Sequence, residues 1–139
     1  MPLRALAEAD LDTIRRLRNA NRKYFFYDAE ITPEQQAAWF KALPANPIHF
    51  YVIEEAAGVV GTISTNAWPD GIEIGNLLLD PAARGKGLMR AAVRELTAAP
   101  GHYFAKVKSG NTPSLAVFTD TGFTVESSGE VVRLIKDVR

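Results

Sequence analysis

Apolar and polar residues follow one another along the chain in short blocks that predict strands and helices. Strand patterns cover residues 2–7, 49–54, 59–66, 72–79, 102–107, 123–126 and 131–135. Helical spacing of apolar residues is found at about 10–20, 33–43, 87–98 and 112–121. This order predicts an α+β fold of three layers, with a mixed, mostly antiparallel sheet of six to seven strands and about four helices.

Several helix ends carry a local signal. Asp10 is the expected N-cap of the first helix, and Thr32, Pro33 and Gln35 are typical of a capping box that starts the second. Gly122 is expected to end the last helix. The apolar residues of the second helix are expected to form its buried side, namely Ala37, Ala38, Trp39, Phe40 and Leu43.

The strand at 72–79 is followed by a helix and then by the strand at 102–107. Because a helix crosses over between them, we expect the two strands to lie parallel and side by side, with a right-handed connection. If these two strands splay apart at their C-terminal ends, the gap beyond them is where a ligand fits, as in open α/β sheets.

Between the first of these strands and its helix lies a basic loop with two glycines, Arg84-Gly85-Lys86-Gly87. The first N–H groups of a helix have no partner within the helix and attract anions, and glycines let the backbone approach a ligand closely. The loop is therefore a candidate pyrophosphate site, although a solvated glycine-rich connection remains the alternative. The P-loop pattern G-x-x-x-x-G-K-S/T and the dinucleotide pattern G-x-G-x-x-G are both absent.

Composition narrows the chemistry further. The length of 139 residues predicts a single domain over 1–139, and 16 basic against 16 acidic residues argue against nucleic acid as a partner. With no cysteine and only two histidines, a thiol nucleophile is excluded and no metal site is expected. Neither a signal peptide nor a membrane span is recognisable, so we expect a cytoplasmic protein without a membrane partner.

Two sequence blocks together resemble the GNAT superfamily of N-acetyltransferases. The loop Arg84-Gly85-Lys86-Gly87-Leu88-Met89 is similar to the acyl-CoA signature R-x-x-G-x-G/A and departs from it only at Met89. The residues Asn111, Ser114, Phe118 and Gly122-Phe123 are similar to the second block, N-x-x-A-x-x-x-Y-x-x-x-G-F. The first strand and helix also fit, so the resemblance covers nearly the whole chain and implies a GNAT-like fold with a splayed parallel strand pair.

The resemblance implies acetyl-CoA as cofactor. Its pyrophosphate would lie on the amides of 85–89, Asn111 would bond near the pantetheine arm, and backbone near Leu78 would donate to the thioester carbonyl. The expected cofactor-binding residues are Leu77, Leu78, Leu79, Arg84, Gly85, Lys86, Gly87, Leu88, Met89, Arg90, Asn111, Ser114 and Phe118.

Glu73 is the expected catalytic base, since it lies in the strand that leads to the loop and some family members keep a glutamate there. Regular alternation would place Glu73, Gly75, Leu77 and Leu79 on one face of that strand. The alternative is a solvated carboxylate on an exposed face. Phe118 replaces a tyrosine that protonates the departing thiolate in many members, so water or no donor at all would serve here.

The front half of the chain is similar to GNAT members that acetylate amino groups on nucleotide-linked sugars. The expected acceptor-binding residues are Arg18, Tyr24, Phe25, Phe26 and Trp39. We therefore expect direct acetyl transfer to a primary amine of a small molecule, with a nucleotide-linked amino sugar as the first candidate. A peptide or protein N-terminal amine and a non-catalytic acyl-CoA-binding module are the alternatives, and a homodimer is left open.

Overall fold

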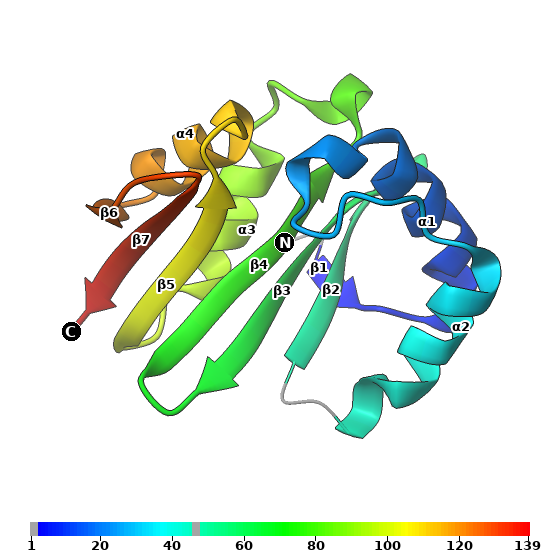
Figure 1. The fold of residues 1–139 in the computed structure, drawn as a ribbon, viewed down its shortest axis with the longest axis horizontal. Coiled ribbons are helices and arrows are strands. Elements are labelled where there is room, and N and C mark those ends of the chain that lie inside the picture. The colour runs from blue at the N-terminus through cyan, green and yellow to red at the C-terminus, as the bar shows by residue number, and fades with distance from the viewer. Residues whose placement is uncertain (1–2, 46–47) are drawn as a thin grey trace.

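The computed structural model of the protein describes residues 3–45 and 48–139, so Pro2 of the predicted first strand lies outside the described part. Seven strands of this part form one sheet in the order β1-β2-β3-β4-β5-β7-β6 (Figure 1). Their bounds are β1 Leu3–Ala5, β2 Ile48–Glu55, β3 Gly58–Trp68, β4 Gly71–Leu79, β5 Gly101–Lys108, β6 Thr124–Ser127 and β7 Val131–Val138. Every neighbouring pair is antiparallel except β4 and β5, which confirms the predicted mixed sheet.

Four α-helices cover the two faces of this sheet. The helices α1 (Leu11–Ala20) and α2 (Pro33–Ala42) lie on one face, and α3 (Leu88–Leu96) and α4 (Thr112–Asp120) lie on the other (Figure 1). Short 3-10 turns extend the helical segments at Glu8–Asp10, Arg22–Tyr24, Leu43–Ala45 and Pro81–Ala83. The predicted three layers and four helices are therefore confirmed. Within the described ranges, no helix combines the length and the apolar character needed to cross a bilayer.

The main core lies between the sheet and the helices α3 and α4. Ile63, Ile74 and Tyr103 from the strands pack there against Val93 and Phe118, and all five side chains are almost completely buried. Met89, the residue that departs from the loop signature, belongs to this core and is 6% exposed. Its larger side chain is therefore accommodated by the core, and the space beside Gly85 and Gly87 stays open.

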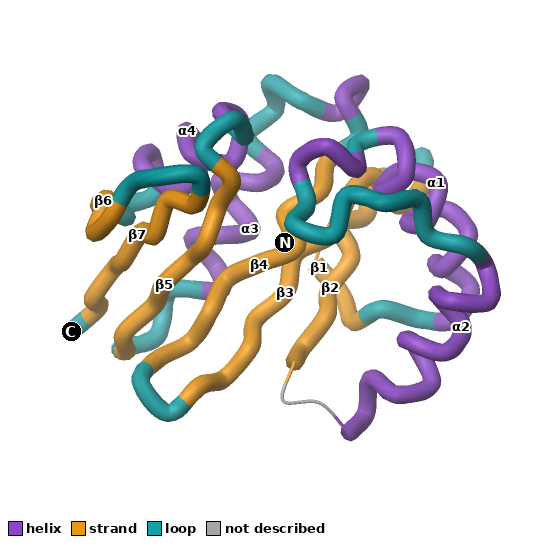
Figure 2. The backbone as a smooth tube through the Cα atoms, viewed as in Figure 1, coloured by secondary structure: helices purple, strands orange, loops and turns teal. Residues whose placement is uncertain are grey.

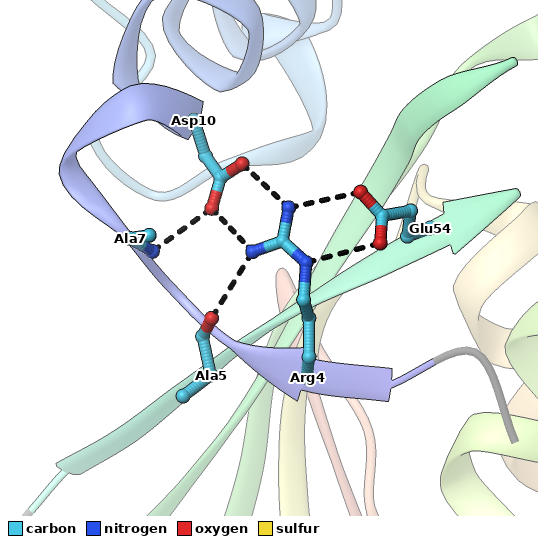
Figure 3. A network of polar contacts seen from close by, with 5 residues as sticks. All are labelled: Arg4, Ala5, Ala7, Asp10 and Glu54. Carbon is cyan, nitrogen blue, oxygen red and sulfur yellow. Dashed lines mark hydrogen bonds and ion pairs between the residues drawn. The ribbon is translucent and has the colours of Figure 1, made fainter.

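The start of α1 differs from the prediction. Asp10 stands at the predicted N-cap position directly before α1, but it is the last residue of a 3-10 turn, has helical backbone angles, and its side chain caps no helix N–H. Its carboxylate instead accepts hydrogen bonds from the Ala7 amide and from the guanidinium of Arg4, which also bonds Glu54 (Figure 3). The carboxylate that would have capped the helix is therefore bonded to Arg4 of β1 instead.

The start of α2 agrees with the prediction, but its buried side agrees only in part, because Trp39, Phe40 and Leu43 are half-buried and the two alanines are not. The Gln35 amide donates to Thr32 Oγ1 at 3.1 Å, and the Thr32 amide donates to Gln35 Oε1 at 2.9 Å, as a capping box requires. The buried residue of this helix is Gln36, whereas Ala37 and Ala38 are exposed. Gln36 Nε2 donates to the Leu11 carbonyl, and this hydrogen bond makes the polar burial tolerable.

The parallel strands β4 and β5 are paired only at their beginnings. Ile72 lies opposite Tyr103 and Glu73 opposite Phe104, and beyond these two pairs the strands are no longer neighbours. Both strands continue for several residues toward the ends that carry the loops. The predicted splay is therefore present, and it opens the sheet at the C-terminal end of β4.

A β-bulge interrupts β4 just before this end. Thr62 of β3 pairs with Leu78, but Ser64 pairs with Gly75, so β4 holds one extra residue between these pairs. Asn76 takes a left-handed backbone angle there, with φ of 54°, and its carbonyl accepts a hydrogen bond from Thr62 Oγ1 at 2.7 Å. One extra residue reverses the alternation of side chains. The expectation that Glu73 and Gly75 share a face with Leu77 and Leu79 was therefore wrong.

Candidate functional site

Two cavities meet in the gap between β4 and β5. The first, here called the loop cavity, has a volume of about 200 Å³ and lies between Leu77–Leu79, the loop at 84–87 and the beginning of α4. The second, the strand cavity, is of about the same size and contains Glu73, Gly75, Lys106 and Phe118. Five residues line both cavities: Tyr24, Phe25, Leu77, Asn111 and Ser114. We call these five residues the junction.

The glycines of the loop form an open concave surface at the start of α3. Gly85 and Gly87 have left-handed backbone angles, with φ of 85° and 73°, and no atom lies within 4 Å of the place where a Cβ would stand. Gly87 directly precedes α3, so the unpaired amides of the first helical turn face the same space. These features fit a pyrophosphate, because backbone donors converge where no side chain intrudes.

Positive charge surrounds this loop. Lys86 pairs with Glu55 at 3.3 Å, and Arg90 pairs with Asp120 of α4 at 2.6 Å. Arg84 is exposed and forms no ion pair with any residue of the described part. A phosphate group can therefore bind Arg84 without breaking an existing ion pair. The pair of Arg90 with Asp120 also joins α3 to α4.

The bulge brings backbone groups to the edge of the same gap. Leu77 and Leu78 follow the extra residue in β4, and both line the loop cavity. A bulge leaves the ladder of backbone hydrogen bonds locally incomplete. Because β5 has already turned away at this point, an N–H group of this segment is placed to donate to a bound ligand.

At the junction, Asn111 and Ser114 form the beginning of α4. Asn111 is 7% exposed, and its Oδ1 accepts from the Ser114 amide at 3.3 Å as the N-cap of the helix. Capping occupies only its oxygen, so its amide nitrogen is left for a ligand. The Ser114 hydroxyl forms no hydrogen bond with any described residue, although the residue is 8% exposed and lines both cavities.

Glu73 lines the strand cavity from β4 and is half-buried. Its carboxylate accepts a hydrogen bond from Trp68 Nε1 at 3.0 Å, which fixes its orientation but leaves further lone pairs open. Phe118 forms part of the opposite wall and packs edge-to-face on Phe123, with ring centroids 5.0 Å apart. With no hydroxyl of its own, Phe118 contributes packing to this wall.

A third cavity, the helix cavity, lies under α1 and α2 and has a volume of about 370 Å³. Arg18 and Trp39 line it, together with Asn76 and Leu78 from the bulge. Phe25 lines all three cavities and therefore stands where they converge. Among the predicted acceptor residues, Phe26 is the most exposed, at 56%, and it lines the strand cavity.

The segment between α1 and α2 carries the junction aromatics across the end of β4 (Figure 2). Lys108 at the end of β5 holds this segment, because its Nζ donates to the Lys23 carbonyl at 3.3 Å and lies 3.7 Å from Asp28 Oδ2. Sequence patterns gave no sign of this contact, which joins residues far apart in the chain. They also missed Asn76, for which an asparagine inside an apolar strand is the only signal.

A family model described as acetyltransferase (GNAT) domain matches residues 1–124. The chain belongs to the GNAT acetyltransferase family. The GNAT assignment makes it an acetyl-CoA-dependent N-acetyltransferase, and the glycine loop, the splay and the bulge are the parts of this chain that fit the cofactor. A search of curated protein sequences finds no significant match.

Solved structures share this GNAT fold at low sequence identity. A ribosomal-protein-alanine N-acetyltransferase from Brucella melitensis superposes with a TM-score of 0.82 at 18% identity, covering 99% of this chain and all of that one. A phosphinothricin acetyltransferase from Sinorhizobium meliloti in complex with AcCoA gives 0.81 at 20% identity, covering 99% and 89%. A spermidine N-acetyltransferase from Vibrio cholerae in complex with CoA and spermine gives 0.78 at 21%, covering 97% and 94%. These three proteins have different acceptors in their names, so the shared fold leaves the acceptor of this GNAT protein open.

Proposed function

We propose that this protein transfers an acetyl group from acetyl-CoA directly to a primary amine of a small molecule, with the residues of the gap between β4 and β5 as its active site. The observation that supports this best is the continuity of the loop cavity and the strand cavity through the junction. A ligand anchored on the glycine loop can extend along Asn111 and Ser114 to reach Glu73. The expected cofactor residues all line this path or flank it.

When bound, acetyl-CoA supplies an acetyl group activated as a thioester. Gly85, Gly87 and the amides of the first turn of α3 hold its phosphates, and Arg84 adds a charge. The amide nitrogen of Asn111 holds the pantetheine arm, and a backbone N–H next to the bulge orients the carbonyl. Since the chain has no cysteine, no thiol can take up the acetyl group before the amine does.

Two protons must move during such a transfer. An amine attacks only in its neutral form, and Glu73, oriented by Trp68, is the carboxylate placed to accept its proton directly or through water. The departing sulfur needs a proton in return. Phe118 has none to give, so we assign to the unpartnered hydroxyl of Ser114, which stands at the junction, the relay of a proton from water: it passes its own proton to the sulfur and receives one from the water.

For the acceptor, a nucleotide-linked amino sugar remains our first candidate, because aromatic side chains can stack on a sugar or base and Arg18 can meet a phosphate. A peptide N-terminal amine is the alternative. The helix cavity favours a small molecule, since it lies under α1 and α2 and is lined mostly by apolar side chains. A cytoplasmic location fits such substrates.

The direct test is release of free CoA thiol from acetyl-CoA over a panel of amines, with calorimetric titration of CoA alongside. We expect CoA to bind and at least one small amine to raise thiol release above the hydrolysis background. Binding of CoA without turnover on any amine would favour a non-catalytic acyl-CoA-binding module instead. Absence of CoA binding would refute the proposal as a whole.

A further inference from the structure

Arg18 of α1 forms no ion pair with any residue in the described ranges 3–45 and 48–139. Its Nη2 donates to the Tyr27 carbonyl at 2.9 Å, but its Nη1 is buried and has no hydrogen-bond partner in these ranges. The guanidinium lies over the ring of Phe25, 4.4 Å from its centroid. It also lies 5.9 Å from the ring centroid of Tyr27, which belongs to the same segment. Burial lowers the pKa of Arg18 from its ordinary value, yet an arginine remains charged under these conditions.

The other arginines of the same helix are paired. Arg15 and Arg16 both contact Asp12, and Arg15 also donates to Gln36 Oε1 at 3.1 Å. Arg18 is therefore the exception on α1, and its half-buried position makes this exception costly. The contact with Phe25 offsets part of this cost, but it satisfies no N–H group. A buried donor of this kind is best explained by a ligand that brings the missing acceptor.

The surroundings of Arg18 select the sign of that ligand. Among the described residues, neither aspartate nor glutamate lines the helix cavity, whereas two arginines do. The charged amino groups of a polyamine would lose water on entering this cavity and would find no carboxylate there to pair with. An anion would find the fork of Arg18 and, in the lining of the same cavity, the side-chain amide of Gln35.

The helix cavity also reaches the place where transfer would occur. Asn76 and Leu78 of the bulge line it, and so does Phe25, which belongs to the junction. A molecule whose anionic group lies at Arg18 can therefore extend its amine past Phe25 toward the gap between β4 and β5. The cavity volume of about 370 Å³ is enough for a small metabolite.

We propose that the acceptor is an amine that carries an anionic group, either a carboxylate or a phosphoryl group, and that Arg18 binds this group in the helix cavity. This inference rests on the proposed acetyl transfer and specifies the class of its acceptor. It makes Arg18 a specificity-determining residue that contacts substrate away from the reacting atoms.

The test compares amines in pairs matched except for the anionic group, with kcat/KM expressed per neutral amine because the anion also changes the pKa of the amine. Glycine against glycinamide reports on a carboxylate, and glucosamine 6-phosphate against glucosamine reports on a phosphoryl group. For at least one pair, we expect the anionic member to have a kcat/KM roughly ten- to a hundredfold higher, mostly through KM. The pair that shows the effect identifies the source of the anion.

Three variants assign this preference to Arg18. In Arg18→Gln the preference should disappear, and in Arg18→Lys, which keeps the charge but loses the fork, part of it should remain. The matched control is Arg16→Gln, which removes an exposed, paired arginine from the same helix and should leave the preference intact. Thermal melting of each variant shows whether the fold is intact. Its kcat with an amine that lacks the anionic group shows whether the reaction is intact.

Outcomes separate this inference from the proposed function. If amines are acetylated without preference for the anion, or if Arg18→Gln keeps the preference, the inference is wrong and the transferase proposal stands. If no amine is acetylated, the same pairs are titrated calorimetrically into the CoA-saturated protein, where CoA blocks the glycine loop. Tighter binding of the anionic members that is lost in Arg18→Gln then supports the inference, and equal binding overturns it.

Discussion

Ser114 and Phe118 lie one turn apart on α4, and both side chains face the strand cavity. A helical side chain leans toward the N-terminus and covers the turn before its own Cα. A tyrosine at position 118 would therefore bring its hydroxyl over the turn that contains Ser114. Relative to the family motif, Phe118 removes the tyrosine hydroxyl and Ser114, in place of alanine, adds one. The added hydroxyl lies in nearly the same region but on a shorter side chain.

This arrangement predicts that Ser114→Ala lowers kcat by about tenfold, since a thiolate is a good leaving group and loses only part of a general-acid contribution. Adding Phe118→Tyr to Ser114→Ala should restore most of the loss, because the new hydroxyl reaches the same region. Steady-state kinetics with acetyl-CoA measure both effects. An unchanged kcat in Ser114→Ala would show that the sulfur takes its proton directly from water.

Glu73 gives a second prediction for a single side chain. Glu73→Gln keeps the shape and an acceptor for Trp68 Nε1 but removes the base, so kcat should fall about a hundredfold with little change in CoA affinity. The pH–rate profile of the variant should differ from that of the unsubstituted protein. Asp70→Asn, in the exposed turn before β4, is the control and should change neither quantity. A Glu73→Gln enzyme with an unaltered pH–rate profile would exclude Glu73 as the base.

At the scale of elements, the glycine loop depends on two residues with left-handed backbone. Gly87 has φ of 73° and open space beside it, so a side chain there would point toward the ligand and would also be strained. Gly87→Asp should weaken CoA binding by a hundredfold or more, because its carboxylate faces the phosphates. Gly87→Asn tolerates the backbone better and lacks the charge, so it should weaken binding much less.

Calorimetric titration of CoA compares these two variants with Gly129→Asp as a control. Gly129→Asp adds the same charge in a turn that is distant from the loop in sequence, where the nearest atom to an added Cβ is the Val131 carbonyl oxygen at 3.9 Å. We expect the control to bind CoA like the unsubstituted protein. Equal affinity for all four proteins would place the pyrophosphate elsewhere. Equal weakening in Gly87→Asp and Gly87→Asn would assign the effect to backbone strain.

Sequence patterns were sufficient for the elements and insufficient where a tertiary contact overrides a local signal. Thr32 and Gln35 formed their predicted capping box because both partners lie within one turn. Asp10 failed as a cap because Arg4 and the Ala7 amide compete for its carboxylate. The bulge at Asn76 depends on Thr62 and Ser64 of the neighbouring strand, which no pattern within β4 could reveal.

The candidate site follows the same rule. Its loop was predictable because Gly85, Gly87 and the start of α3 are consecutive in the chain. The junction was only partly predictable, because Tyr24 and Ser114 meet through the segment that Lys108 holds across β4. The lack of a counter-ion at Arg18 could not be predicted, since it depends on what every neighbouring element places around one side chain.

At the scale of the whole molecule, the N-terminal strand is joined to the rest by few contacts. β1 pairs through three residues with β2, at the edge of the sheet. Arg4 strengthens this edge by bridging Asp10, at the entrance to α1, and Glu54 of β2 (Figure 3). The helix α1 carries Arg18 and leads into the junction aromatics, so this bridge helps to hold one wall of the site in register with the sheet.

The bridge makes stability depend on pH in a defined direction. Hydrogen bonds from Arg4 hold the pKa of Asp10 below its ordinary value of 3.8, against the opposing effect of burial. A carboxyl with a lowered pKa in the folded state stabilises that state fully above its ordinary pKa. Below this value the unfolded chain takes up the proton first, and the contribution is lost as the pH falls through the folded-state pKa.

We therefore expect Asp10→Asn to lower the free energy of unfolding at neutral pH, by about 1 kcal/mol since Arg4 is partly exposed and solvent screens the pair. The difference between the variant and the unsubstituted protein should shrink as the pH falls from 3.8 through the lower folded-state pKa, because Asp10 is protonated first in the unfolded state and then in the folded state. Urea unfolding over a series of acidic pH values measures this difference directly. Glu8→Gln, in the same turn but outside the bridge, is the control. A difference for Asp10→Asn that persists unchanged in acid would mean that shape, and not the charge of the bridge, stabilises the start of α1.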